Sequence, residues 1–302
     1  MDRMTVNGDV GSTGHGGTFR RRRRRAASAW VEIRPRPGWQ PVALRELWSF
    51  RDLLILLIGR DVRIRYKQTV LGVIWVILQP LLTTGIFTLL FGRMAGLAEQ
   101  TGSVPYPLFV FAGLLPWTFF ASAVTYATTS VVANRNLITK VYFPRLLLPL
   151  AGVGVSLVDA AVVCAALVGL MALYGVVPGG SLLLVPVCLL LIGLTAVGVG
   201  SFLAGLSALY RDFIHVVPFG LQVWFYLTPV IYPAQLVPEG WRWLWALNPM
   251  THLIECFRHA LLGDLQAWNL PRFLGALVLT AFVAGVGLVT FRRLERRFAD
   301  LV

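Results

Sequence analysis

Few residues of this chain are of a type and spacing that would break or form covalent bonds. No Ser/His/Asp arrangement and no convergent pair of carboxylates indicates hydrolysis or glycosyl transfer. A Walker A phosphate-binding loop needs Gly-Lys-Ser/Thr, but the only lysines, Lys67 and Lys140, follow Tyr66 and Thr139. The sequence therefore predicts a protein that is not an enzyme and has no cofactor in this chain. Any energy from ATP, with its Mg²⁺, would come through a partner subunit.

Asp159 is the one formal charge deep inside an apolar stretch. A carboxylate at that depth in a membrane is costly, so it should face the protein interior or water, or be protonated. One interpretation is a residue of a transport pathway or its gate. The other is a hydrogen-bonded contact between packed helices. The residues alone leave both open.

Aromatic residues are concentrated in three apolar stretches. Aromatic faces stack on the C–H faces of sugars and would guide a sugar polymer without tight binding. The alternative is a membrane-interface belt together with bulk that faces lipid. The candidates for a glycan path or its gate are Trp75, Trp117, Phe119, Phe120, Tyr126, Asp159, Trp224, Tyr226 and Tyr232.

Three further polar residues share one side of a predicted helix. His252, Cys256 and His259 fall within about 60° of one another at 100° per residue, opposite an apolar stripe. Such donors could hold a metal, but they also fit the polar face of an amphipathic helix. We predict no metal site. The other cysteines, Cys164 and Cys188, are too scattered to indicate a disulfide framework.

The elements that carry these residues are those of a membrane protein. Of 302 residues, 57% are hydrophobic and 14% are charged, against about 25% charged in a soluble domain. Several apolar stretches are long enough to cross a bilayer as helices. We predict an all-α integral membrane fold with six transmembrane helices, at about 71–92, 107–132, 146–174, 182–209, 213–233 and 270–291.

The remaining segments are too polar or too short to span. Residues 1–39 form a basic tail that we expect to be disordered and cytoplasmic, and it includes six consecutive arginines. We predict an amphipathic interfacial helix in the cytoplasmic segment at 40–70 and the six-span transmembrane domain at 71–297. Between spans five and six, Asn248-Pro249 is a helix start, and tryptophans precede it. We expect short re-entrant or interfacial helices there.

The placement of basic residues predicts the orientation. The net charge is +13, and 23 of the 27 Lys and Arg residues lie on the side that holds both termini. The positive-inside rule places that side in the cytoplasm. The charge is therefore explained by topology rather than by nucleic-acid binding. The cytoplasmic loop at 134–145 would present an apolar and a basic face to a partner, although it also fits a simple positive-inside loop.

Several motifs, in order over about residues 40–297, resemble those of ABC-2 type polysaccharide export permeases, the translocators of O-antigen, teichoic acid and capsule. They are RDVRIRYKQTVLG (60–72), FAGLLPW (111–117), NLITKVYFPR (136–145), YRD (210–212), TPVIYP (228–233) and LNPM (247–250). The chain departs from the pattern at three positions. Cys256 and His259 stand where we expect a Gly and an aromatic residue, and Thr228 replaces a common Ser.

The resemblance implies a homodimer that forms a channel for a lipid-linked polysaccharide in the bacterial inner membrane, paired with two copies of a separate ABC ATP-binding subunit. Spans one and five would line the path and its lateral opening, and the segment at 241–262 would close the outer end. The surface helix and the 134–145 loop would contact the ATPase through Arg60, Asp61, Arg63, Asn136, Lys140, Tyr142 and Arg145.

Two other functions remain as alternatives. An ABC-2 permease for a drug or a simple lipid would need fewer aromatic residues along its path. An integral membrane glycosyl- or acyltransferase would need a carboxylate or histidine cluster, and the sequence offers none.

Overall fold

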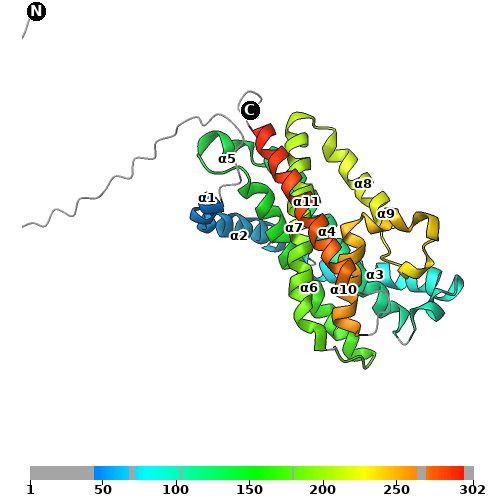
Figure 1. Cartoon of the computed structure of the whole chain (residues 1–302). Coiled ribbons are helices and arrows are strands. Elements are labelled where there is room, and N and C mark those ends of the chain that lie inside the picture. Colours follow the sequence, from blue (N-terminus) through cyan, green and yellow to red (C-terminus); the bar gives the residue numbers. More distant parts are fainter. Residues whose placement is uncertain (1–43, 68–71, 103, 179, 264–269, 296–302) are drawn as a thin grey trace, which may run out of the picture. The chain divides into compact units, whose positions relative to one another are not determined.

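The computed structural model describes residues 44–67, 72–102, 104–178, 180–263 and 270–295, and every regular element in these ranges is a helix (Figure 1). The predicted tail at 1–39 lies outside the described residues, as does the part of the first motif at 68–71. Five helices in the described ranges are long and apolar enough to cross a membrane. They are α3 (Gly72–Phe87) with its π-helical continuation η1 (Thr88–Met94), α4 (Tyr106–Ala133), α6 (Leu147–Leu173), α7 (Leu184–Leu209) and α11 (Leu270–Glu295).

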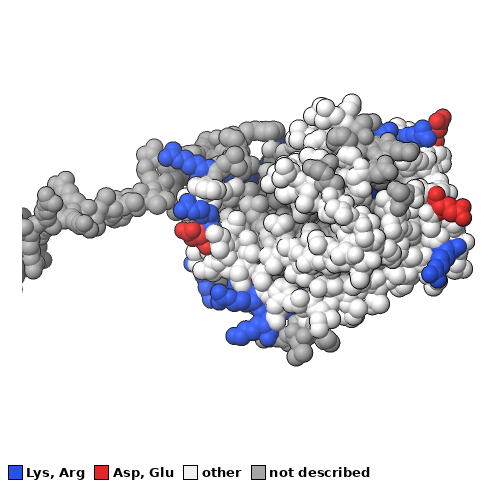
Figure 2. All heavy atoms as spheres, turned by 90° about the horizontal axis from the view of Figure 1, so that it is seen from below, with Lys and Arg blue, Asp and Glu red and all other residues white. Residues whose placement is uncertain are grey.

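These helices confirm the predicted all-α membrane fold. The shortest of the five has 23 residues, or about 35 Å at 1.5 Å per residue, which exceeds the roughly 30 Å of hydrocarbon in a bilayer. A multi-pass membrane protein follows from these lengths. On the face in Figure 2, the charged side chains lie mainly toward two opposite ends, with a band of uncharged residues between them.

The fifth predicted span is a shorter apolar helix, α8 (Phe213–Leu227), of 15 residues. It ends six residues before the predicted boundary at 233. Thr228 has an extended backbone, with φ −101° and ψ 136°, because the ring of Pro229 excludes the helical conformation from the residue before it. At about 22 Å, α8 is shorter than the hydrocarbon layer, and a turn at 228–233 follows it.

Helix α4 forms the core of the bundle. Most of its residues are buried, and it packs against α3, α6, α7, α8 and α10. Its apolar side chains, such as Phe111 and Phe120, are completely buried in the main hydrophobic cluster. The positions of the site residues on α4 are therefore fixed by neighbours on several sides.

Helices α7 and α11 cross in close contact. A Cβ atom added to Gly287 would lie 2.0 Å from the carbonyl oxygen of Gly198, so only glycine fits at this crossing. The Oγ1 atoms of Thr195 and Thr280 lie 3.1 Å apart between the same two helices. Small residues and hydroxyl contacts of this kind hold transmembrane helices together, because lipid provides no hydrophobic driving force between them.

Helices α1 (Leu44–Ser49) and α2 (Arg51–Lys67) lie in the segment for which an amphipathic interfacial helix was predicted. Leu57 of α2 is buried against the start of α6, in a cluster with Phe143 and Leu147. Ile58 packs so closely on Gly154 that a Cβ atom there would lie 2.4 Å from it. Part of the apolar surface of α2 therefore packs on protein, while Ile55, Leu56 and Ile64 are exposed. Helix α5 (Arg135–Lys140) contributes Leu137 to the same cluster.

Short helices lie in the connections between the spans. The predicted helix start at Asn248-Pro249 is confirmed, because the Asn248 side chain accepts a 3.1 Å hydrogen bond from the Met250 amide and Pro249 is the first helical residue. The short helices in the connections are η2 (Leu97–Thr101), η3 (Gly180–Leu183), η4 (Ala234–Leu236), η5 (Glu239–Trp241), α9 (Arg242–Ala246) and α10 (Pro249–Leu262).

Candidate functional site

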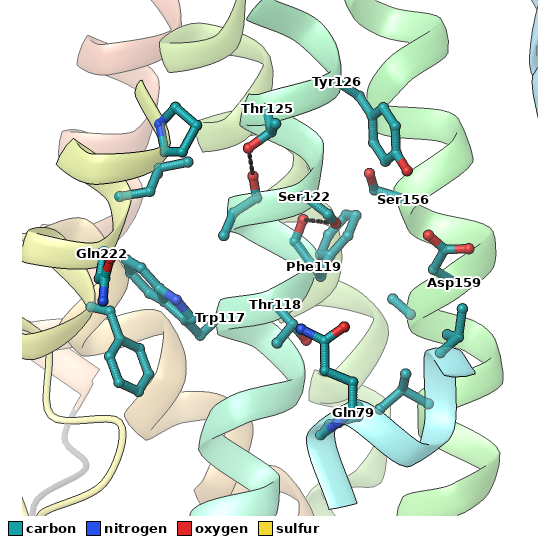
Figure 3. A pocket seen from close by; sticks show the side chains of 18 of the residues that line it. Gln79, Trp117, Thr118, Phe119, Ser122, Thr125, Tyr126, Ser156, Asp159 and Gln222 are labelled. Carbon is teal, nitrogen blue, oxygen red and sulfur yellow. Dashed lines mark hydrogen bonds between the residues drawn. The ribbon is translucent and has the colours of Figure 1, made fainter. Parts of the chain in front are cut away.

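A cavity of about 640 Å³ lies between α3, α4, α6 and α8, and we call it the central cavity (Figure 3). Its lining combines aromatic side chains with neutral polar ones from all four helices. Only Arg65 and Asp159 among its lining residues carry a formal charge. The neutral polar residues are Gln79, Thr118, Ser122, Thr125, Ser156 and Gln222.

The hydroxyl groups of α4 reach the cavity because of their spacing. Thr118, Ser122 and Thr125 recur four and three residues apart, which places them on one face of the helix. Each hydroxyl donates to a carbonyl of its own helix, with distances of 2.8–3.1 Å. The hydroxyl oxygens can still accept hydrogen bonds. The wall is therefore polar but makes no strong site for one particular ligand.

Asp159 contacts Arg65 and Tyr66 of α2, and Arg65 in turn contacts Tyr126 of α4. The Arg65 guanidinium lies 2.6 Å from the Asp159 carboxylate. The Tyr66 hydroxyl donates to the same carboxylate, and Arg65 also donates to the Tyr126 hydroxyl. We call these four residues the Arg65 cluster. It joins α2 at the surface to α4 and α6.

The protonation of Tyr66 fits its role as a donor. Burial raises the pKa of Tyr66 well above its usual range, and the hydrogen bond to Asp159 raises it further. The phenol therefore stays protonated at every physiological pH. Tyr66 is therefore available as a hydrogen-bond donor to the Asp159 carboxylate over that range.

A packed group of aromatic residues beside the central cavity joins α4 to α8. The rings of Trp117 and Phe120 on α4 meet Trp224 on α8, with centroids 6.4 and 5.1 Å away. The Trp224 indole donates to Asn248 at 3.1 Å, and Asn248 donates to Thr228 at 2.9 Å. Helix α8 is therefore tied to the N-terminal end of α10.

A buried arginine organises the segment that follows α8. Arg258 of α10 is only 2% exposed. Its guanidinium donates to the carbonyls of Phe109 and Pro229 at 3.2 and 2.9 Å, and to that of Val230. We call this arrangement the outer clamp. It fixes α10 to the start of α4 and to the turn after α8, and Gly113 leaves the space that it needs.

Polar contacts also join α2 to the end of α4 and the 134–145 loop to α11. Arg60 donates to Asp61 at 2.7 Å and to Asn134 at 2.9 Å, which links α2 to the end of α4. Arg145 donates to the carbonyl of Glu295 at 2.9 Å and so links the 134–145 loop to α11.

Comparison with known proteins identifies the family. A sequence model of the ABC-2 type transporter family matches residues 52–262, more than half of the chain. The chain belongs to this family. It is a membrane permease, and ABC-2 permeases work with a separate ATP-binding subunit.

The permease is related to bacterial polysaccharide export proteins. It is 29% identical over 253 residues to the O-antigen export system permease protein RfbA of Klebsiella pneumoniae, covering 83% of this chain and 95% of the relative. It is 34% identical over 218 residues to the RfbA protein of Myxococcus xanthus, covering 71% and 82%. It is 23% identical over 246 residues to the polysialic acid transport protein KpsM of Escherichia coli, covering 77% and 90%.

The predicted path residues of the permease fall into three groups. Trp117, Phe119, Tyr126, Asp159 and Tyr226 line the central cavity. Phe120, Trp224 and Tyr232 are held in contacts beside it, with the Tyr232 hydroxyl donating to the Tyr226 carbonyl at 3.2 Å. Trp75 lies away from the cavity lining on the exposed face of α3, with 57% of its surface accessible.

The residues predicted to contact the ATPase fall into two groups. Arg60, Asp61 and Arg145 take part in the polar contacts within the chain described above. Arg63, Asn136, Lys140 and Tyr142 are exposed on α2, α5 and the adjoining loop. The exposed residues are thus the ones that remain available to a partner.

Sequence reasoning missed Arg65, Arg258 and the neutral polar wall. The spacing of Thr118, Ser122 and Thr125 in an otherwise apolar span was a usable signal, because polar residues inside a span face the interior or a water-filled cavity. Nothing in the sequence pairs Arg65 with Asp159. In the part of the chain that the structure describes, no group of three His, Cys, Asp or Glu residues is placed to hold a metal.

Proposed function

We propose that this permease moves a lipid-linked polysaccharide, such as an O-antigen or a teichoic-acid or capsule-like polymer, from the cytoplasmic to the outer face of the bacterial inner membrane. The observation that carries the proposal is the lining of the central cavity. Aromatic faces and neutral hydroxyl and amide groups interact with successive sugars without holding any one of them tightly. The relatives named for O-antigen export and polysialic acid transport support the same class of substrate.

We further propose the assembly and its orientation. Two copies of the chain form the channel, and two copies of an ABC ATP-binding subunit drive it from the cytoplasm, where both termini lie. The exposed apolar side chains of α3, such as Val73, Ile74 and Ile86, suit it to pack on a second copy or on lipid. The exposed residues Lys140 and Tyr142 of the inner loop suit it to contact the ATPase.

The Arg65 cluster gives a route from that contact to the cavity. Helix α2 packs on the same hydrophobic cluster as α5, and its Arg65 reaches the Asp159 carboxylate in the cavity wall. A displacement of α2 by the ATPase therefore acts directly on a charged group that lines the path.

A photo-crosslinking experiment tests the substrate class. A photoreactive amino acid placed at Tyr226, which lines the cavity and is 55% exposed, should form adducts with the polymer in cells. The matched control is Phe282 of α11, which is 67% exposed but does not line the cavity. Adducts that contain a drug-like molecule or a simple lipid, and no sugar, would favour the alternative permease function.

A further inference from the structure

Two cysteines from distant parts of the sequence meet inside the protein. Cys188 lies near the start of α7 and Cys256 lies in the middle of α10, and their Sγ atoms are 3.0 Å apart. The S–S bond of a disulfide is about 2.04 Å long, so a movement of about 1 Å brings the two sulfur atoms to bonding distance. We propose that Cys188 and Cys256 form a disulfide that ties α10 to the outer end of α7.

The surrounding packing keeps the two sulfur atoms together. Both cysteine side chains are completely buried in the main hydrophobic cluster. Helix α10 packs along α7 and against η3, which immediately precedes α7. Independently of the cysteines, the outer clamp fixes α10 through three backbone carbonyls bound by Arg258. The closeness of the sulfur atoms therefore comes from two well-packed helices.

The location of the pair suits a disulfide, and this step rests on the orientation proposed above. Cys188 is the fifth residue of α7, about 6 Å along the helix axis from its first residue. In that orientation, the connection between α6 and α7 and the whole of α10 lie on the outer side of the membrane. Disulfides form and persist in the oxidising compartments outside the cytoplasm.

The oxidation needs an electron acceptor, which we identify as a dithiol–disulfide oxidoreductase on the outer side. One cysteine thiolate attacks the disulfide of the oxidant and forms a mixed disulfide, which the second thiolate then resolves. The two thiols lose two protons and two electrons, and the oxidant is released as a dithiol. Because both sulfur atoms are buried in the folded chain, this exchange takes place before α10 packs on α7.

The cross-link has a consequence for transport. With α10 joined covalently to α7, the outer segment at 249–262 is a fixed part of the outer wall. An opening of the outer end would then have to move α8 and the turn at 228–233 away from α10, which breaks the contacts that Arg258 and Asn248 make with them. The polymer would pass α10 without displacing it.

Alkylation of the full-length protein tests the proposal. Membranes are dissolved in hot SDS with N-ethylmaleimide and no reductant, so that burial no longer protects any thiol, and the alkylated cysteines are identified by mass spectrometry. We expect Cys164 to be alkylated in every sample, and Cys188 and Cys256 only after reduction with dithiothreitol. All three thiols are free in the structure, and Cys164 of α6, which is not part of the pair, serves as the internal control. Alkylation of all three residues without reductant would overturn the proposal.

A variant identifies the partner. In Cys256→Ala, Cys188 should become alkylated without reductant, because its only proposed partner is gone. If Cys188 stayed blocked, the modification would be something other than this disulfide, and the pairing would be wrong.

A separate measurement tests the orientation. Cys164, Cys188 and Cys256 are replaced by Ala, and Val177→Cys is introduced in the connection between α6 and α7, where the residue is 82% exposed. A membrane-impermeant maleimide should label this cysteine in intact cells. Labelling only after the cells are broken open would overturn the proposed oxidant and the orientation, while the alkylation result would still decide whether the disulfide exists.

Discussion

The guanidinium of Arg65 lies 2.6 Å from the carboxylate of Asp159 and so joins the surface helix α2 to the wall of the central cavity. The same guanidinium donates to the Tyr126 hydroxyl on α4 and lies 5.3 Å from the centre of its ring. One side chain of the inner surface is thus held by two spans. A movement of α2 cannot leave the cavity unchanged.

We predict that Asp159→Asn and Arg65→Gln each lower the stability of the protein and reduce export. Removing one partner leaves the other charge without compensation, which costs about 3–5 kcal/mol for a fully buried pair and less here, because a third of the Arg65 side chain is exposed. The apparent Tm in detergent measures stability, and polymer at the cell surface measures export.

The double variant tests whether Asp159 and Arg65 stabilise the protein through their mutual contact. Because the two residues contact each other, the loss in Asp159→Asn/Arg65→Gln should be smaller than the sum of the single losses. Arg63→Gln, at an exposed residue of the same helix, is the control for stability and should leave the apparent Tm unchanged. Normal export by Asp159→Asn at normal expression would reduce Asp159 to a packing role.

Arg258→Ala should destabilise the outer segment strongly. The substitution leaves the carbonyls of Phe109, Pro229 and Val230 without their donor, and each buried unpaired group costs about 1–3 kcal/mol. Arg258→Lys should recover little, because an ammonium cannot reproduce the planar fork of donors. The control is Arg242→Ala, at an exposed residue. Its apparent Tm should stay close to that of the wild type, because a surface substitution changes the free energy of unfolding by no more than about 0.5 kcal/mol. A small effect of Arg258→Ala would show that the outer clamp does not hold this segment.

The stability of the protein should decrease as the pH rises, because Glu255 loses its proton. Burial raises the pKa of Glu255 from 4.5 to about 7, although Arg272 and Arg258 oppose the increase. The folded carboxyl therefore binds its proton more tightly than the unfolded one. Its contribution is fully present below pH 4.5 and is lost as the pH rises to about 7. A difference of this size between the folded and the unfolded pKa lowers the free energy of unfolding by about 3 kcal/mol.

Glu255→Gln should remove this part of the pH dependence. Apparent Tm values between pH 4.5 and 8 should fall less steeply with pH in the variant than in the wild type, and above pH 7 the variant should be the more stable of the two. Glu239→Gln serves as the control, because the Glu239 side chain is 87% exposed. Equal slopes in Glu255→Gln and the wild type would disprove the assignment.

The proposed contact with the ATP-binding subunit makes a prediction about the inner loop. Lys140→Ala/Tyr142→Ala should reduce the amount of ATPase that co-purifies with the permease severalfold, because both side chains are exposed beside α5. Neither side chain is in the hydrophobic core, so the apparent Tm should stay unchanged. A control pair at the other end, Leu173→Ala/Val177→Ala, is also exposed and should leave co-purification intact. Full co-purification of the Lys140/Tyr142 variant would place the ATPase elsewhere.

The sequence predicted the spans well, because long apolar stretches leave little choice of structure in a membrane. Span boundaries agree within a few residues for α4, α6 and α7. The fifth span was predicted too long, because hydropathy continues through Val230 and Ile231 although Pro229 has already ended the helix. Hydropathy measures composition, whereas the end of a helix depends on backbone geometry.

The charged contacts of the site could not be predicted, because they join distant parts of the chain. Asp159 was recognised as a costly charge, but its partner lies on a surface helix whose position depends on the packing of Leu57 and Ile58. Arg258 lies in the segment for which short re-entrant or interfacial helices were expected, and it is buried against carbonyls of α4 and of the turn after α8. Every residue has a backbone carbonyl, so the sequence does not show which carbonyls an arginine binds. The outer clamp could therefore not be predicted.

The most direct test of the proposed function is to deplete the permease in cells and to measure on which face of the inner membrane the lipid-linked glycans are found. If the permease exports polysaccharide, long polymer on its lipid carrier should accumulate on the cytoplasmic face, while the outer face loses it. If the polymer failed to form at all, the chain would be acting in synthesis. Unchanged glycans on both faces would contradict polysaccharide export and direct the search to drugs or simple lipids.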